Sequence, residues 1–137
     1  MSISNWAYLD THTMFIALKG CMTGEEHKET ARIMAEIARE LPVRQLLVDK
    51  SDVGNGEREE EIPCVAESAA RTFTGAGLMR IAFLLAHDDP VAAPFSKAFA
   101  RCGGEAKAFD DYGEALAWLG VKPAESQSRT AAASAAR

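Results

Sequence analysis

The sequence predicts an α/β fold: a single five-stranded mixed, mostly parallel sheet that begins with an N-terminal β-hairpin and carries four helices. Two observations lead to this prediction. Residues 46–48 and 81–85 are short apolar runs without polar alternation, which is typical of strands buried on both faces of a parallel sheet. Segments with a helical apolar period separate these runs, and helices that alternate with buried strands favour parallel pairing through right-handed crossovers.

The length and composition indicate one compact domain. A chain of 137 residues can bury an ordinary core, and its 47% hydrophobic and 26% charged residues exclude a disordered chain or a coiled coil. The net charge of −5 argues against nucleic acid as a partner, because phosphate binding needs a concentrated basic surface. Cys21, Cys64 and Cys102 lack the spacing of a metal site, and we expect them to be reduced and mostly buried.

The first elements are a hairpin and a capped helix. Residues 6–9 and 14–18 are bulky apolar runs on either side of the polar residues 10–12, which predicts two antiparallel strands joined by a turn. The helix that follows starts at a capping box, in which Thr23 accepts from the amide of Glu26 and the Glu26 side chain reaches back to Thr23.

An apolar stripe along this first helix is expected to face the sheet. It repeats every four residues at Ile33, Ile37 and Leu41. Its width comes from three smaller or flexible side chains, Ala31, Met34 and Ala38. Pro42 cannot continue a helix, so we expect the helix to end near Leu41.

The middle of the chain repeats the alternation of strand and helix. The strand at 46–48 is followed by a loop at 51–56, which is rich in Gly, Asp and Asn. The second helix starts near Pro63, a residue suited to a first helical turn. It turns three side chains inward: Val65, Ala69 and Phe73.

The last third of the chain supplies the remaining elements of the domain. In order, we expect a strand at 81–85, a helix through Phe95 and Phe99, a short strand at 106–109 and a helix capped by Asp111. Residues 121–137 are rich in Ala and Ser and lack bulky side chains. We therefore expect a domain at residues 1–120 and a C-terminal tail at 121–137.

Several of these segments occur together in a known family. Besides the hairpin, they are Leu18-Lys19-Gly20 before the capped helix, Leu46-Leu47-Val48-Asp49, Arg80-Ile81-Ala82-Phe83 and the closing run from Phe109 to Leu119. In this pattern the chain resembles the SpoIIAA-like STAS domains, above all those of unknown function, and more distantly the CRAL-TRIO domains that bind lipophilic ligands. The resemblance covers the chain up to Gly120 and implies a non-catalytic regulatory or protein-interaction domain.

One departure from the family concerns its phosphorylation switch. In the phospho-regulated members, a strand that ends in Asp leads through a short loop to an Asp-Ser at the start of the next helix, and a kinase modifies that serine. Asp49, Ser51 and Val53 fit the beginning of that pattern. The switch position falls near Glu57 and Arg58, which carry no hydroxyl, so we expect a domain without the usual phosphoserine.

The candidate site lies at the carboxyl ends of the strands, where open parallel sheets bind their ligands. The predicted partner or ligand edge consists of Asp49, Ser51, Asp52, Asn55, Gly56, His87 and Asp88. Asp89 and Asp111 stand where helix caps belong, which disfavours a Mg²⁺ site built from them. Cys21 and His87 form the one nucleophile–base pair that this edge offers. A single pair of this kind often occurs by chance, so we predict no catalytic residues. We also predict no metal and no cofactor.

Two functional hypotheses remain open at this stage. The first is a domain whose edge at residues 49–61 binds a protein partner. The alternative is a binder of a small apolar molecule or lipid, which an apolar pocket of a few hundred Å³ between a helix and the sheet would favour. The aromatic residues available for such a pocket are Trp6, Phe73, Phe95, Phe99 and Trp118. An enzyme is a third alternative, which a hydrolase screen would test.

Location and assembly are also expectations from sequence. The chain has no signal-peptide pattern and no apolar run near the roughly 20 residues that cross a bilayer, so we expect a cytoplasmic protein without a membrane span. The hairpin leaves an edge strand exposed, and such strands pair with other chains. A homodimer is therefore a further hypothesis.

Overall fold

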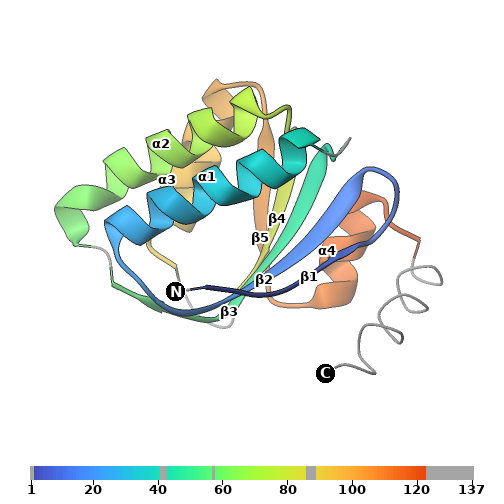
Figure 1. The fold of residues 1–137 in the computed structure, drawn as a ribbon, viewed down its shortest axis with the longest axis horizontal. Coiled ribbons are helices and arrows are strands. Elements are labelled where there is room, and N and C mark those ends of the chain that lie inside the picture. Colours follow the sequence, from blue (N-terminus) through green and yellow to red (C-terminus); the bar gives the residue numbers. More distant parts are fainter. Residues whose placement is uncertain (1, 41–42, 57, 86–88, 123–137) are drawn as a thin grey trace.

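The structure, a computed structural model, describes residues 2–40, 43–56, 58–85 and 89–122. Its core is a five-stranded sheet in the order β1-β2-β3-β4-β5 (Figure 1). The strands are β1 (Ser2–Tyr8), β2 (Thr13–Met22), β3 (Gln45–Asn55), β4 (Arg80–Leu84) and β5 (Glu105–Phe109). β1 and β2 are antiparallel and all other neighbours are parallel, which confirms the predicted mixed sheet with an N-terminal hairpin.

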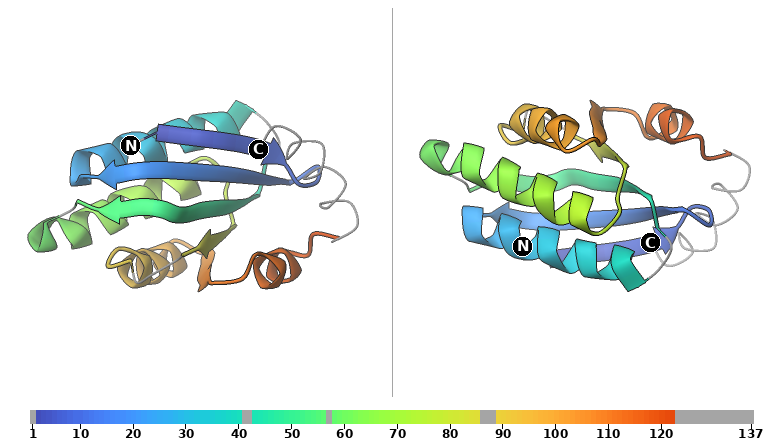
Figure 2. Two further views of the ribbon diagram at one scale, coloured as in Figure 1. Left: turned by 90° about the horizontal axis from the view of Figure 1, so that it is seen from below. Right: turned by 90° about the horizontal axis from the view of Figure 1, so that it is seen from above.

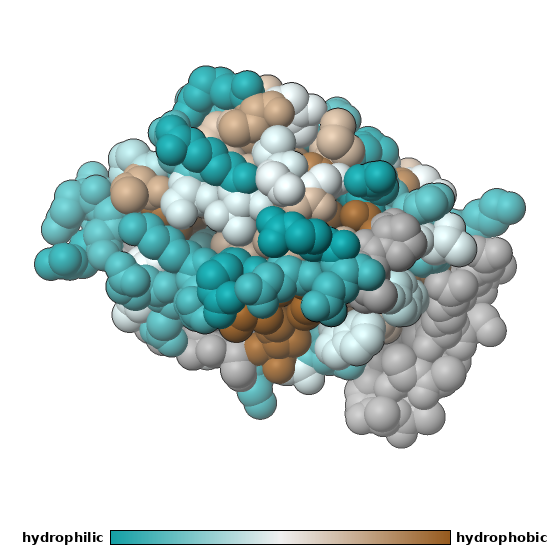
Figure 3. Space-filling model, turned by 45° about the horizontal axis from the view of Figure 1, so that its top comes forward, coloured by the Kyte–Doolittle hydropathy of each residue, from teal (hydrophilic) through white to brown (hydrophobic). Residues whose placement is uncertain are grey.

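In the described ranges, four α-helices cover the sheet on both faces. They are α1 (Gly24–Glu40), α2 (Ile62–Gly75, preceded by the short 3-10 helix Glu59–Glu61), α3 (Ala92–Arg101) and α4 (Tyr112–Leu119). The first three lie on one face and α4 lies on the other (Figures 1 and 2). The outer side of the three-helix layer is mostly hydrophilic, with a small hydrophobic patch at its lower margin in Figure 3. These layers enclose two hydrophobic cores, a large one under α1, α2 and α3 and a small one under α4.

The amino ends of the helices form as the sequence predicts. The Thr23 amide donates to Glu26 Oε1 at 3.2 Å, and the Glu26 amide donates to Thr23 Oγ1 at 3.2 Å, which completes the capping box. Pro63 lies in the first turn of α2. Asp111 caps α4 by accepting from the Glu114 amide at 2.9 Å. Local side-chain chemistry therefore fixes where these helices begin.

The apolar face of α1 is centred differently from the prediction, although Ile37 is half-buried and packs against the large core as expected. Its buried face carries Ala31, Met34, Ala35 and Ala38, whereas Ile33 is 36% exposed. An α-helix has 3.6 residues per turn, so spacings of three and four must alternate to keep one face in contact with the sheet. A strict four-residue repeat drifts around the helix, which carries Ile33 away from the core. Leu41 lies outside the described residues.

The predicted loop at 51–56 is strand as far as Asn55. β2 continues to Met22, and its last residues pair with β3, from Lys19 opposite Asp52 to Met22 opposite Asn55. The register shifts between Ala17 and Lys19, so that the single residue Leu18 faces two residues of β3. Beyond this β-bulge, residues 52–55 of β3 pair with β2 as a strand, although most of their residue types favour turns.

The second core extends slightly beyond residue 120. Gly120 ends α4 in the left-handed region (φ +77°), and the Val121 amide then donates to the carbonyl of Leu116 at 3.0 Å. Val121 is 3% exposed and packs against Leu119 and Leu9 in the small core. The first residue of the predicted tail is thus part of the packed domain. Residues 123–137 lie outside the described residues.

Two cysteines differ from the expectation of burial. Cys64 lies on α2 beside Pro63, and Cys102 directly follows α3. Both are exposed free thiols. Cys64 is exposed because the buried stripe of α2 runs through Val65, Ala69 and Phe73, as predicted, and the position before Val65 faces outward.

Candidate functional site

The predicted edge residues lie along the end of β3. β4 ends at Leu84, whose partner in β3 is Asp49, and β3 continues to Asn55 with β2 as its paired neighbour. We call residues 50–55 the projecting segment of β3. Ser51 and Asp52 belong to it, as does the backbone of Asn55, and Gly56 follows directly. His87 and Asp88 lie outside the described residues, so the structure does not test their place in the site.

The carboxylate of Asp49 accepts hydrogen bonds from the start of the projecting segment. Its Oδ1 atom accepts from the Ser51 amide at 2.9 Å and also from the Ser51 hydroxyl. Both side chains are half-buried, whereas Asp52 is exposed. The structure thus brings Asp49 and Ser51 together to support the bulge and leaves Asp52 as the carboxylate that faces solvent.

A buried ion pair lies beneath the projecting segment. The ammonium of Lys50 contacts the carboxylate of Asp89, and each side chain is 7% exposed. Lys50 Nζ also lies 5.6 Å from the centroid of the Phe83 ring. Lys50 is not among the site residues predicted from sequence, although strand alternation gives a signal for it. Leu46, Val48 and Lys50 are two residues apart, so all three point to the same face of the sheet.

Asp89 connects this ion pair to the start of α3. Its Oδ1 atom accepts from the Val91 amide at 2.9 Å, while Oδ2 contacts Lys50. Burial by itself raises the pKa of Asp89, but the charge and hydrogen bond of Lys50, together with the Val91 amide, outweigh burial and hold that pKa below its ordinary value. The carboxylate is therefore ionised at neutral pH and ties β3 to the segment that leads into α3.

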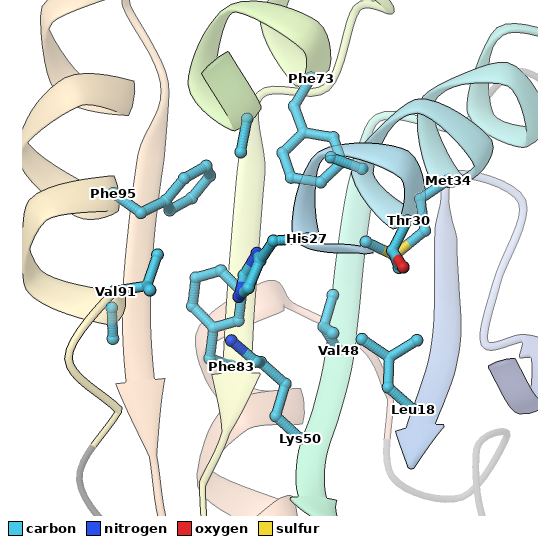
Figure 4. Close-up of a pocket in the computed structure, with 13 residues that line it drawn as sticks. Leu18, His27, Thr30, Met34, Val48, Lys50, Phe73, Phe83, Val91 and Phe95 are labelled. Carbon is cyan, nitrogen blue, oxygen red and sulfur yellow. The ribbon is translucent and has the colours of Figure 1, made fainter. Parts of the chain in front are cut away.

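His27 on α1 completes the buried cluster. Its ring lies beside Lys50 and Phe83 (Figure 4). Burial, reinforced by the positive charge of Lys50 and opposed by Asp89, lowers the pKa of His27 to about 4 from its ordinary 6.5. The imidazole is thus neutral at pH 7, and the cluster holds one positive and one negative charge. Three elements, α1, β3 and the start of α3, meet at this point.

The space beneath the helices is nearly filled. A cavity of about 30 Å³ lies among apolar side chains next to His27 and Lys50. Phe95 fills much of the surrounding space, since its ring centroid lies 5.8 Å from that of Phe73 and 5.3 Å from that of Phe83. A cavity of this size accommodates about one water molecule. It is much smaller than the pocket of a few hundred Å³ that the apolar-ligand hypothesis anticipated.

Metal-binding groups and membrane-spanning helices also bear on function. No group of three or more His, Cys, Asp or Glu side chains in ranges 2–40, 43–56, 58–85 and 89–122 is placed to hold a metal ion. Within the same ranges, no helix has both the length and the apolar character needed to cross a membrane.

Comparison with known proteins identifies the fold. No protein-family model and no curated protein sequence matches the chain. Among solved structures, the anti-sigma factor antagonist SpoIIAA in its unphosphorylated form matches with a TM-score of 0.53 and 11% sequence identity, over 86% of this chain and 97% of that chain. The Bacillus cell fate determinant SpoIIAA in its phosphorylated form matches with a TM-score of 0.50 and 13% identity, over 84% and 97% of the two chains. The chain therefore has a SpoIIAA-like STAS fold, which confirms the resemblance inferred from sequence.

Proposed function

We propose that this chain is a cytoplasmic, non-catalytic regulatory domain that binds a protein partner at the carboxyl-end edge of its sheet. The observation that carries the proposal is the projecting segment of β3. It extends past β4 and carries the exposed carboxylate of Asp52, while the buried Lys50–Asp89 pair fixes it from below. The fold adds support, because the similar structures are of an anti-sigma factor antagonist. A rigid, preorganised edge lowers the entropic cost of binding.

The charge of this edge indicates a basic partner surface. The 3-10 helix before α2 adds the exposed carboxylates of Glu59 and Glu60 to that of Asp52. Glu61 is engaged within the domain, since its Oε1 atom accepts from the Arg58 amide at 2.9 Å. Arg58 neutralises part of this charge, since its Nε atom lies 3.7 Å from Glu60 Oε1. Lys19, the exposed partner of Asp52 in β2, neutralises another part. The carboxylates of Asp52, Glu59 and Glu60 still outnumber these two cations, and complementary charge speeds and orients protein association.

The proposed domain works without the usual phosphoserine. Residues 58–63 at the start of α2 carry no hydroxyl, and the Ser51 hydroxyl is bonded to Asp49. Intact-mass spectrometry of the chain purified from its native cells should therefore find Ser51 unmodified. A phosphate on Ser51 would contradict this part of the proposal.

The alternative role, binding of a small apolar molecule or lipid, has less support. Such a ligand needs a pocket several times larger than the cavity of about 30 Å³ beside Phe95. Of the candidate aromatic side chains, Phe73 and Phe99 both pack against Phe95 in the large core. Binding beneath the helices would thus require α1 and α3 to separate from the sheet. The groove of about 370 Å³ between α2 and α3 suits an apolar ligand poorly, because Glu67, Lys97 and Arg101 are among the residues that line it.

Charge reversal at the edge tests the proposed function. Tagged wild-type chain, an Asp52→Lys variant and a Glu36→Lys control on the outer face of α1 are used to recover proteins from native lysate. We expect at least one protein that binds the wild type and the control directly and stoichiometrically in a purified reconstitution, with at least tenfold weaker binding to Asp52→Lys. Binding that is equal for all three chains, or the absence of any reconstituted partner, would overturn the proposal.

A further inference from the structure

We infer that β1 mediates a homodimer, in which this strand pairs antiparallel with β1 of a second copy and extends the sheet across both chains. β1 stands at one end of the strand order, so its outer backbone edge faces away from the sheet. An edge of this kind presents N–H and C=O groups that another strand can pair with. This inference does not depend on the proposed partner edge, which lies at the far end of β3.

β1 lacks the charged residues and proline that protect many edge strands. Charged side chains, especially Lys, and proline commonly prevent such edges from pairing. The strand Ser2–Tyr8 contains neither, although 26% of the whole chain is charged. The opposite edge strand, β5, contains both Glu105 and Lys107. Only one of the two sheet edges is therefore chemically suited to pairing.

Exposed aromatic side chains mark the same edge. Trp6 is 51% exposed and Tyr8 is 36% exposed, and their rings meet edge to face at 6.0 Å. Their partners in β2 are Ile16 and Met14, which face the large core, so both aromatic rings lie on the α1 side of the sheet. Half-exposed Trp and Tyr are typical anchors of protein interfaces.

A further exposed apolar side chain belongs to the helix that covers this end of the sheet. α1 covers the end of the sheet formed by β1 and β2 (Figure 2), and its residue Ile33 is 36% exposed. Three of the four large hydrophobic side chains exposed among the described residues, Trp6, Tyr8 and Ile33, thus belong to one end of the sheet. The fourth is Met79, immediately before β4.

The strand is complementary to itself. A two-fold axis perpendicular to the sheet at Ala7 keeps both copies of α1 on the same face and sets Trp6 of each chain opposite Tyr8 of the other. The β-bulge between Ile3 and Asn5 limits the regular part of β1 to residues 5–8, and residues 6–8, which this axis pairs, lie within that part. Two chains of net charge −5 repel each other, and contact through an uncharged strand sets no carboxylate against another. A second copy therefore fits this edge.

Light scattering with a charge substitution tests the homodimer. The purified full chain should have twice the mass of one chain at micromolar concentration. Trp6→Lys adds a protective charge to the edge, and since Trp6 is half-exposed this variant should fold and have the mass of one chain. Met79→Lys changes an equally exposed hydrophobic residue, 51% exposed, and should stay dimeric. A wild-type chain that is monomeric, or a Trp6→Lys chain that is dimeric, would overturn the inference.

Disulfide trapping tests the position of the axis. Residues directly opposite each other in an antiparallel pair have Cα atoms about 4.5–5.5 Å apart, which a disulfide can span. In a background with Cys21, Cys64 and Cys102 replaced by Ser, Ala7→Cys should form covalent dimers on oxidation, and Glu105→Cys on β5 should not. Equal cross-linking at both positions would refute pairing through β1. Because no other protein is present, this result is independent of the search for a partner at β3.

Discussion

His27 shows how burial changes the chemistry of one residue. The imidazole lies beneath α1 next to an ammonium group, and both surroundings disfavour its charged form. A lone histidine on a helix carries no sequence signal for this. For Asp89 the charge of a neighbour outweighs burial, since Lys50 keeps the buried carboxylate ionised. The two groups together make the stability of the domain sensitive to acid.

Acid should therefore destabilise the protein through His27. Its pKa is about 4 in the folded protein and about 6.5 in the unfolded chain, so the unfolded chain binds more protons between these values. The stabilisation is complete above pH 6.5 and is lost as the pH falls toward 4. The loss is up to about 3 kcal/mol in the free energy of unfolding. The pKa of Asp89 lies below its ordinary value, so its contribution is lost only at still lower pH.

Urea denaturation at a series of pH values measures this effect. The unfolding free energy of the wild type should decline between pH 7 and pH 4, and His27→Gln should remove most of that decline. The control is His12→Gln in the hairpin turn, which should keep the wild-type slope. An unchanged slope in His27→Gln would show that other groups cause the acid sensitivity.

At the scale of elements, the Lys50–Asp89 pair joins β3 to α3. The strand end projects past β4, and the pair gives this end a charged anchor in the large core. A buried ion pair adds little net stability compared with an apolar pair, but removal of one partner leaves an uncompensated buried charge. The main effect of the pair is therefore to fix the position of the strand end relative to the start of α3.

A double-mutant cycle should reveal this coupling. Lys50→Met leaves Asp89 buried without its cation and should lower the free energy of unfolding by about 3–5 kcal/mol. Lys50→Met combined with Asp89→Asn removes both charges and keeps an acceptor for the Val91 amide, so it should recover most of that loss. Chemical denaturation of the wild type and three variants measures the cycle. Additive losses in the double variant would show that the two residues do not act as a pair.

For the whole molecule, the limits of the folded domain depend on α4. This helix closes the small core, and Val121 follows its left-handed end to pack against Leu119. We propose that the stable unit is the predicted domain of residues 1–120, extended by the two residues that complete this core. Residues 123–137 are not required in this proposal.

Truncation tests this boundary. A chain that ends at residue 122 should unfold at the same temperature as the full chain. A chain that ends at residue 120 lacks Val121 and should lose about 1–2 kcal/mol. Differential scanning calorimetry of the three chains makes the comparison. A large loss on ending the chain at 122 would show that the predicted tail belongs to the folded domain.

The sequence by itself determined the layers, the order of the elements and the amino ends of α1, α2 and α4. These features depend on local information, such as the Thr23–Glu26 capping box or Pro63 in a first turn, and on apolar runs that need two covering layers. The two-residue alternation of side chains along β3 also indicates that Lys50 points inward. A charged residue is not expected in a core, and this inward position was therefore not predicted.

The tertiary structure alone decided how long β3 is, which face of α1 is buried and what surrounds the candidate edge. Asp, Gly and Asn favour turns by themselves, and only the pairing partner supplied by β2 makes residues 51–55 a strand. Asp89 and His27 meet Lys50 from segments far apart in the sequence, and no local pattern encodes that meeting. The physical reason is that pairing and burial are properties of neighbours in space, whereas propensity is a property of neighbours along the chain.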